Sequence, residues 1–307
     1  MTSTEAGHGI GVGGSRHDTL AGAEERTVTT DDGATLAVTV APGTADTTDT
    51  AVTTGTAGTA GPTVVFAHGW TNNRSVWLPV AREVAAAGHP VVLYDQRGHG
   101  ASTLGTEALG IERLGDDLAQ LVEQLDLRGV VLVGHSMGGF TVMSFACRHR
   151  DLLASRVRGM ALVSTAAHGL SMGRMTPLAA RLLRSRTVDR VVRARSGLVF
   201  TRRVLGRRPL PQHVRSTREM YLATPAEVRA GYFATFGGMD LRTCLAVVDV
   251  PTAVVVGARD TLTRPRLGQV IAETIPGARY EVLPDAGHML PFERTTEIVA
   301  EVLSLAR

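Results

Sequence analysis

The serine at position 136 lies in the pentapeptide Gly134-His-Ser-Met-Gly138, which places a reactive side chain between two glycines. An apolar run, 129–134, precedes it, and a helix-compatible stretch, 139–148, follows it. This order predicts a strand, a sharp turn and a helix, with the serine at the apex of the turn. A serine hydroxyl is a weak nucleophile until a neighbouring base accepts its proton, and a strained turn holds its oxygen clear of the backbone. The segment therefore predicts nucleophilic catalysis by Ser136.

A nucleophilic serine needs a base, and the base needs a carboxylate that orients it. Residues 252–257 read as a buried strand that leads to Asp260, and residues 280–284 read as a last strand that leads to His288. Because the carboxyl ends of parallel strands converge on one crevice, we expect Ser136, Asp260 and His288 to meet there as a triad. In this triad His288 is the general base and then the general acid, and Asp260 fixes the tautomer of the imidazole.

Three other aspartates compete for the orienting role. Asp249 precedes strand 252–257 and so enters it at the wrong end, and Asp285 lies too close to His288 in sequence. Asp240 precedes the segment that leads into the same strand, and it remains the open alternative to Asp260.

Negative charge develops on the substrate carbonyl oxygen in the transition state of acyl transfer, so such a site also needs N–H donors. The backbone N–H of Met137 follows the nucleophile and is one donor by its position. Residues 63–67 read as an early strand, and the loop after it runs from His68 to Trp70. We expect the backbone N–H of Trp70 to be the second donor of this oxyanion hole.

Four blocks of sequence, taken together in their order, resemble the α/β-hydrolases of the capped esterase, lipase and haloperoxidase-like kind. These blocks are His68-Gly-Trp70, Tyr94–Ser102, Gly134–Gly139, and Gly257–Asp260 with Gly287-His288. The order serine, aspartate, histidine is also the chain order of that fold. The resemblance covers roughly residues 63–307. It implies an α/β fold with a mostly parallel central sheet of the α/β-hydrolase type and an inserted helical cap.

The elements that must position these residues alternate between strand and helix. The predicted order is strand 63–67, helix 75–87, strand 90–94, helix 111–125, the strand, turn and helix around Ser136, and strand 157–164. Such alternation builds a parallel sheet with helices on both faces. Upstream, two alternating segments flank Asp31-Asp32-Gly33 and predict a β-hairpin.

From residue 168 to residue 247 the pattern changes, because no buried strand is evident and the stretch reads as several helices. We interpret this stretch as a cap over the crevice. The predicted domains are therefore a disordered N-terminal extension, 1–22, a hydrolase core made of 23–167 and 248–307, and a helical cap, 168–247.

The cap segment is strongly basic, since residues 172–218 contain thirteen arginines and a single acid, Asp189. Apolar residues lie between the arginines at helical spacing. The simpler interpretation is a solvated cap helix above an apolar site, and the alternative is peripheral contact with anionic lipid or binding of an acidic substrate. We expect no nucleic acid as partner, because aromatic residues are few and no binding motif is recognisable.

Length and composition fit an enzyme of this kind. A chain of 307 residues with 44% hydrophobic residues can bury a full core. No apolar run reaches the roughly 18–20 residues that span a bilayer. The N-terminus lacks a basic region followed by an apolar one, so we expect no signal peptide and a cytoplasmic protein.

No sequence feature predicts a metal or another cofactor. The chain has no H-E-x-x-H segment and no Cys/His cluster, and the glycine-rich segment 9–14 neither follows a strand nor opens a helix. Cys147 and Cys244 do not indicate a disulfide framework, and we expect Cys147 to be a buried thiol. His68 and His99 lie in loops and are expected to be structural.

The leading hypothesis is a serine hydrolase that cleaves a small-molecule carboxylic ester through an acyl-enzyme. The substrate would be a small to medium acyl ester or a monoacylglycerol-like lipid. Alternatives on the same triad are hydrolysis of thioesters, lactones or carbon–carbon bonds, and cofactor-free perhydrolysis. An alternative of another class is a non-catalytic protein that binds small molecules, against which the complete triad argues. Acyl and alcohol preference and oligomeric state do not follow from the sequence.

Overall fold

The computed structural model describes residues 19–44, 61–169 and 176–307 of the chain. The predicted disorder of residues 1–22 therefore falls almost entirely outside the described residues.

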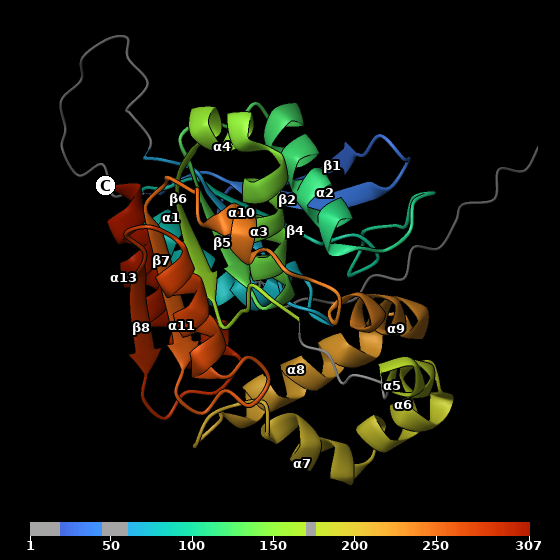
Figure 1. Ribbon diagram of the computed structural model, residues 1–307. Helices are drawn as coiled ribbons and strands as arrows, with labels where there is room; N and C mark the ends of the chain where they lie inside the picture. The colour runs from blue at the N-terminus through green and yellow to red at the C-terminus, as the bar shows by residue number, and fades with distance from the viewer. Residues whose placement is uncertain (1–18, 45–60, 170–175) are drawn as a thin grey trace, which may run out of the picture.

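Eight strands form one sheet in the order β1-β2-β4-β3-β5-β6-β7-β8 (Figure 1). The pairs β1–β2 and β2–β4 are antiparallel, and every other neighbouring pair is parallel. The predicted hairpin and the mostly parallel sheet are thus confirmed. The strands are β1 Glu24–Thr29, β2 Thr35–Ala41, β3 Val64–Ala67, β4 Val91–Tyr94, β5 Val130–His135, β6 Val157–Val163, β7 Thr252–Gly257 and β8 Arg279–Leu283.

The central strands are short runs of apolar residues because both of their faces are covered. All residues of β3, β4, β5 and β7 are buried. A strand that is buried on both faces gains nothing from alternation and favours β-branched residues throughout. The edge strand β8 is different, because most of its residues are exposed or partly exposed and it carries Arg279 and Glu281, charges that discourage edge-to-edge pairing.

Helices cover both faces of the sheet and create two apolar cores. On one face α2 packs on α3, and on the other α1 packs on α13. Burial of apolar surface in these two layers stabilises the sheet, whose parallel strands end at one edge. The core helices are η1 Arg74–Trp77, α1 Leu78–Ala86, α2 Ile111–Gln124, α3 Met137–Arg148, α4 Arg150–Arg156, α11 Pro265–Thr274, α12 Leu290–Glu293 and α13 Thr295–Ala306.

The described residues between β6 and β7 form helices joined by loops, with one isolated β-bridge between His168 and Asp240, as predicted for an inserted helical cap. Figure 1 shows α5 to α9 gathered at the end of the sheet toward which the arrowheads of the parallel strands point. In the described part of the chain, no helix is long and apolar enough to cross a membrane. The inserted helices are α5 Thr176–Leu183, α6 Arg186–Arg193, α7 Arg195–Arg202, α8 Pro211–Ala223, α9 Ala226–Thr235 and α10 Arg242–Leu245.

The two cysteines form a disulfide, which corrects the prediction of a buried thiol at Cys147. Cys147 of α3 and Cys244 of α10 have Cα atoms 5.4 Å apart, within the usual range for a disulfide. The pairing could not be predicted from the sequence, because the two cysteines are 97 residues apart. The two residues meet only because the chain returns from the insertion to pack α10 against α3.

Candidate active site

Ser136 stands at a sharp turn between β5 and α3. Its backbone angles are φ 52° and ψ −115°, a conformation that costs energy for any residue with a Cβ. The two flanking glycines permit the turn. A Cβ on Gly134 would collide with the backbone of Gly138, and a Cβ on Gly138 would collide with the backbone of Ala67 in the neighbouring strand. The sequence G-x-S-x-G therefore meets a steric requirement of this turn.

His288 and Asp260 form a hydrogen-bonded pair at the ends of β8 and β7. His288 Nδ1 lies 2.8 Å from Asp260 Oδ2, and both side chains are buried. Three further donors hold the carboxylate: the N–H groups of Leu262 and Thr263, at 2.8 and 2.9 Å, and the Thr263 hydroxyl, at 2.7 Å. Burial raises the pKa of Asp260, but the electrostatic interaction with His288 and the hydrogen bonds from His288 and Thr263 outweigh it and leave that pKa below its ordinary value.

An ionised Asp260 has a chemical consequence for the imidazole. A carboxylate can only accept, so His288 Nδ1 carries the proton of this bond and Nε2 is left free to act as a base. Ser136 and His288 line the same cavity. No hydrogen bond joins their side chains in the described structure. Such contacts are often long without substrate and shorten in the reactive complex.

The competing aspartates do not reach this cavity. Asp240 is half-exposed and pairs with Arg242 at 2.6 Å. Asp285 is also half-exposed and pairs with Arg259 at 3.2 Å, and Asp249 is exposed. Among the predicted carboxylates, Asp260 is therefore the one that the fold brings to the histidine.

The two predicted oxyanion donors flank the serine from different elements. Met137 is the first residue of α3, so its N–H is one of the N-terminal donors that a helix leaves without an internal partner. Trp70 follows β3 and lines the cavity. The Trp70 indole donates from Nε1 to the carbonyl oxygen of Arg229 at 3.1 Å, which fixes the loop against α9 of the insertion. The role of both backbone N–H groups as oxyanion donors stays a prediction.

A cavity of about 320 Å³ lies between the core and the insertion, with Ser136 and His288 in its wall. The core contributes Trp70 and Phe140, and the insertion contributes side chains of α6, α7, α8 and α9. Of the described residues that line it, none is an arginine, an aspartate or a glutamate. The cavity is therefore suited to an uncharged, largely apolar group. The insertion residues are Val192, Thr201, Val204, Thr217, Tyr221, Phe233 and Phe236.

Glu293 holds the loop that carries His288, a role that the sequence analysis missed. Glu293 Oε2 accepts the N–H groups of Gly206 and Gly287, at 2.6 and 3.0 Å, and Oε1 accepts the N–H of Met289 at 3.0 Å. Two of these donors flank His288 directly, and the third belongs to the insertion. One carboxylate thus ties the histidine loop to α12 and to the segment that follows α7.

The backbone of His288 itself has two more partners. Its N–H donates to the carbonyl oxygen of Val204 at 2.8 Å, and its carbonyl oxygen lies 2.8 Å from Nε2 of His135. Because a carbonyl can only accept, His135 carries its proton on Nε2. Burial lowers the pKa of His135 to about 3, so the ring is neutral. No periodic pattern could have indicated these contacts, because each joins segments that are distant in sequence.

His68 and His99 are structural, in agreement with the expectation. His68 Nε2 accepts the N–H of Gln96 at 2.9 Å, and His99 Nε2 accepts the N–H of Thr71 at 3.3 Å. Burial lowers the pKa of His68 to about 4 and that of His99 to about 3. Both neutral rings connect the loops that follow β3 and β4 beneath the cavity.

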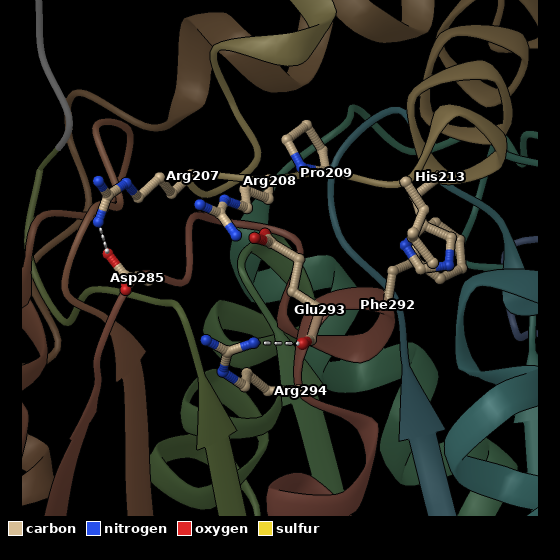
Figure 2. A pocket seen from close by; sticks show the side chains of 9 residues that line it. Arg207, Arg208, Pro209, His213, Asp285, Phe292, Glu293 and Arg294 are labelled. Atoms are coloured by element: carbon tan, nitrogen blue, oxygen red, sulfur yellow. Dashed lines mark hydrogen bonds and ion pairs between the residues drawn. The ribbon is translucent and has the colours of Figure 1, made fainter.

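A second and larger cavity, of about 420 Å³, contains neither Ser136 nor His288 (Figure 2). In it Arg207 faces Asp285 at 3.9 Å, and the ring of His213 stacks on Phe292. None of its described lining residues is a serine, threonine or cysteine, so the smaller cavity, which Ser136 and His288 line, is the candidate active site. No group of three or more potential metal-ligand side chains occurs among the described residues.

Comparison with known proteins agrees with this geometry. The family model for the alpha/beta hydrolase fold matches residues 62–295. The non-heme chloroperoxidase CPO-A1 of Kitasatospora aureofaciens is 29% identical over 241 residues, which are 73% of this chain and 84% of that protein. The 3-oxoadipate enol-lactonase 2 of Acinetobacter baylyi is 26% identical over 235 residues, which are 76% and 84% of the two chains.

Solved structures extend the likeness to nearly the whole chain. A thermophilic esterase from Thermogutta terrifontis is 27% identical with a TM-score of 0.70, over 92% of this chain and 100% of that one. The enol-lactonase from Burkholderia xenovorans LB400 is 25% identical with a TM-score of 0.71, over 89% and 96% of the two chains. With its eight-stranded sheet and a family match across most of its length, this chain belongs to the alpha/beta hydrolase family and is a hydrolase.

Proposed function

We propose that this hydrolase cleaves carboxylic esters through an acyl-enzyme, with Ser136 as nucleophile and His288 as general base and then acid. The observation that carries the proposal is the buried 2.8 Å contact between His288 Nδ1 and Asp260 Oδ2, beside the cavity that Ser136 lines. Asp260 holds the imidazole in the tautomer whose Nε2 can accept the serine proton.

The reaction then runs in two steps. Ser136 Oγ attacks the ester carbonyl while its proton passes to His288, and the N–H groups of Met137 and Trp70 stabilise the negative oxygen that forms. His288 returns the proton to the departing alcohol. In the second step His288 activates a water molecule, which releases the acid and restores the serine.

The walls of the active-site cavity support a neutral, apolar acyl group. A volume of about 320 Å³ is at the small end of the range for ligand pockets. No guanidinium among the described lining residues is available to pair with a carboxylate. This disfavours an anionic substrate such as an oxoadipate lactone, and it favours aliphatic or aromatic esters, including monoacylglycerol-like lipids. We take residues 168–247 as the cap that closes the cavity.

Other reactions on the same three residues remain second candidates. Matched relatives carry the names enol-lactonase, chloroperoxidase and esterase/perhydrolase, so neutral lactones and peracid formation are the first alternatives to test. Thioesters and carbon–carbon substrates come next. A non-catalytic binding protein would not require the Asp260–His288 pair to be kept in this geometry.

The sequence prediction of a cytoplasmic location is weakened by the disulfide. Disulfides persist mainly in oxidising compartments, and cytosolic thiols are usually kept reduced. A disulfide between Cys147 and Cys244 in protein isolated from the producing cell would favour an oxidising compartment, and free thiols would favour the cytoplasm.

The test of the reaction is hydrolysis of p-nitrophenyl esters from acetate to palmitate, with the wild type and the Ser136→Ala variant side by side. We expect turnover only with the serine, and the optimum in acyl chain length then gives the size of the cavity. Labelling by a fluorophosphonate should likewise depend on Ser136. Equal hydrolysis by the two proteins would contradict the mechanism. Labelling without ester turnover would favour lactones, thioesters or peracid formation as the reaction of this site.

A further inference from the structure

The inserted helices carry a net positive charge, whereas the rest of the chain has more acidic than basic residues. Residues 172–218 contain thirteen of the 32 basic residues of the chain and one of its 29 acidic residues. The remainder is acidic on balance, although the whole chain has a formal net charge of only +3. The arginines are therefore concentrated in one part of the chain and are not spread evenly along it.

The single acid in this segment does not neutralise the arginines around it. Asp189 of α6 pairs with Arg229, whose side chain is buried in the insertion. Within the described residues, the exposed arginines of α5 and α6 make no hydrogen bond or ion pair through their side chains. They are Arg181, Arg186, Arg190 and Arg193. Their charges are therefore available to an external anion.

Large apolar side chains lie exposed beside these arginines. Leu178 and Leu182, at 49% and 54% exposure, are four residues apart and so project from the same side of α5. Val191 of α6 is 53% exposed, next to Arg190. We call six of the exposed side chains of these two helices, namely Leu178, Arg181, Leu182, Arg186, Arg190 and Val191, the cap outer face.

The two helices that carry the cap outer face, α5 and α6, lie at the outside of the insertion (Figure 1). Helix α5 packs on α9, and α6 packs on α7 and α8. Figure 1 shows α8 and α9 between the sheet and these outer helices. The inner side of α6 is part of the active-site cavity, because Val192 is buried and lines it. One helix, about 10 Å across, thus separates the cavity from the outside at this point.

We propose that the cap outer face binds the surface of an anionic lipid bilayer. Arginine suits phosphate headgroups because its guanidinium is always charged and donates in a planar fork. Aliphatic side chains between the arginines gain energy only if they enter an apolar medium, which a bilayer supplies and a nucleic acid does not. The combination of charge and exposed leucine therefore favours a lipid surface over other polyanions.

Docking in this way would place the cavity one helix from the lipid headgroups. An apolar ester would then pass from the bilayer to Ser136 over a short path. This consequence rests on the proposed function, whereas binding to the bilayer does not.

The test is co-sedimentation of the full chain with vesicles of phosphatidylcholine alone and with vesicles that also contain phosphatidylglycerol, at low and high salt. We expect binding to the anionic vesicles only, weakened by salt. In the variant R186Q/R190Q the partition coefficient should fall roughly 30-fold, since each arginine near an anionic surface contributes about 1 kcal/mol. The variant L178S/L182S should also bind more weakly.

A matched control removes the same charge from the core. The variant R150Q/R158Q changes two exposed arginines at the other end of the sheet, and it should bind nearly as well as the wild type. Equal loss in this control would mean that only net charge matters, and equal partition into neutral and anionic vesicles would overturn the proposal. Tight binding to heparin that L178S/L182S leaves unchanged, without binding to vesicles, would point to a soluble polyanion instead.

Binding and hydrolysis can be separated with one further protein. The Ser136→Ala variant should bind anionic vesicles as the wild type does. If neither protein hydrolyses esters but both bind these vesicles, the proposed reaction fails and the docking surface stands.

Discussion

Replacement of Glu293 tests whether the position of His288 depends on a carboxylate outside the cavity. The Glu293→Ala variant removes the acceptor of three backbone N–H groups, those of Gly206, Gly287 and Met289. Glu293 is partly exposed, so water can reach these donors. At about 1 kcal/mol for each hydrogen bond, the free energy of unfolding should fall by about 3 kcal/mol.

The effect on turnover should exceed what this loss of stability alone would cause. Two of the three donors flank His288, and a displacement of about 1 Å in a reacting group can lower the rate about 100-fold. We therefore expect kcat for a p-nitrophenyl ester to fall about 10- to 100-fold in Glu293→Ala. KM should change much less, since Glu293 does not line the active-site cavity. The Glu293→Gln variant keeps one carbonyl oxygen as acceptor, so its kcat should lie between those of Glu293→Ala and the wild type.

Glu297 provides the matched control for this experiment. It lies one turn further along the chain, is 43% exposed and reaches Arg294 at 3.5 Å. Exposed ion pairs of this kind contribute little, so Glu297→Gln should leave kcat and the unfolding temperature unchanged. A folded Glu293→Ala protein with the kcat of the wild type would refute the reasoning, because the histidine loop would then hold its position without the carboxylate.

Two further outcomes are expected. Asp260→Asn should lower kcat by up to about 10⁴-fold with little change in KM, because the amide favours the wrong imidazole tautomer; the same ester assay measures this, and a small effect would return Asp240 to consideration. Hydrogen bonds from Arg97 hold the pKa of Asp32 far below its ordinary value of 3.8, so the stabilisation from this carboxylate is complete above that value and is lost as the pH falls further. Urea unfolding at neutral pH and at about pH 3 should therefore show an acid-induced loss of stability that is smaller in Asp32→Asn, and an equal loss in both proteins would argue against this assignment.

The strands and helices that position the candidate site were predicted well because each has a local signal. The predicted strands 63–67 and 90–94 correspond to β3, Val64–Ala67, and β4, Val91–Tyr94, and the predicted helix 111–125 corresponds to α2, Ile111–Gln124. Apolar runs and glycines specify such elements over a few residues. Because parallel strands end at one edge, the order of the segments was enough to bring His288 to Asp260.

Contacts between distant segments were not predicted, because they have no local sequence signal. The Glu293 carboxylate meets Gly206, 87 residues away, and the two cysteines are separated by 97 residues. Neither pair has a periodic or compositional signal. Both depend on how the insertion returns to the core, which tertiary packing decides.

The Cys147–Cys244 disulfide gives the molecule a covalent topology that its linear sequence lacks. The bond closes a ring that contains β6 and the whole of α5 to α9. A protease cut at any one site within this ring leaves the two pieces joined until the disulfide is reduced. The bond also ties α10, in the returning stem of the insertion, to α3 of the core, so any opening over the cavity must leave this stem in place. The crosslink thereby limits which motions of the insertion can admit a substrate, because α10 stays bound to α3.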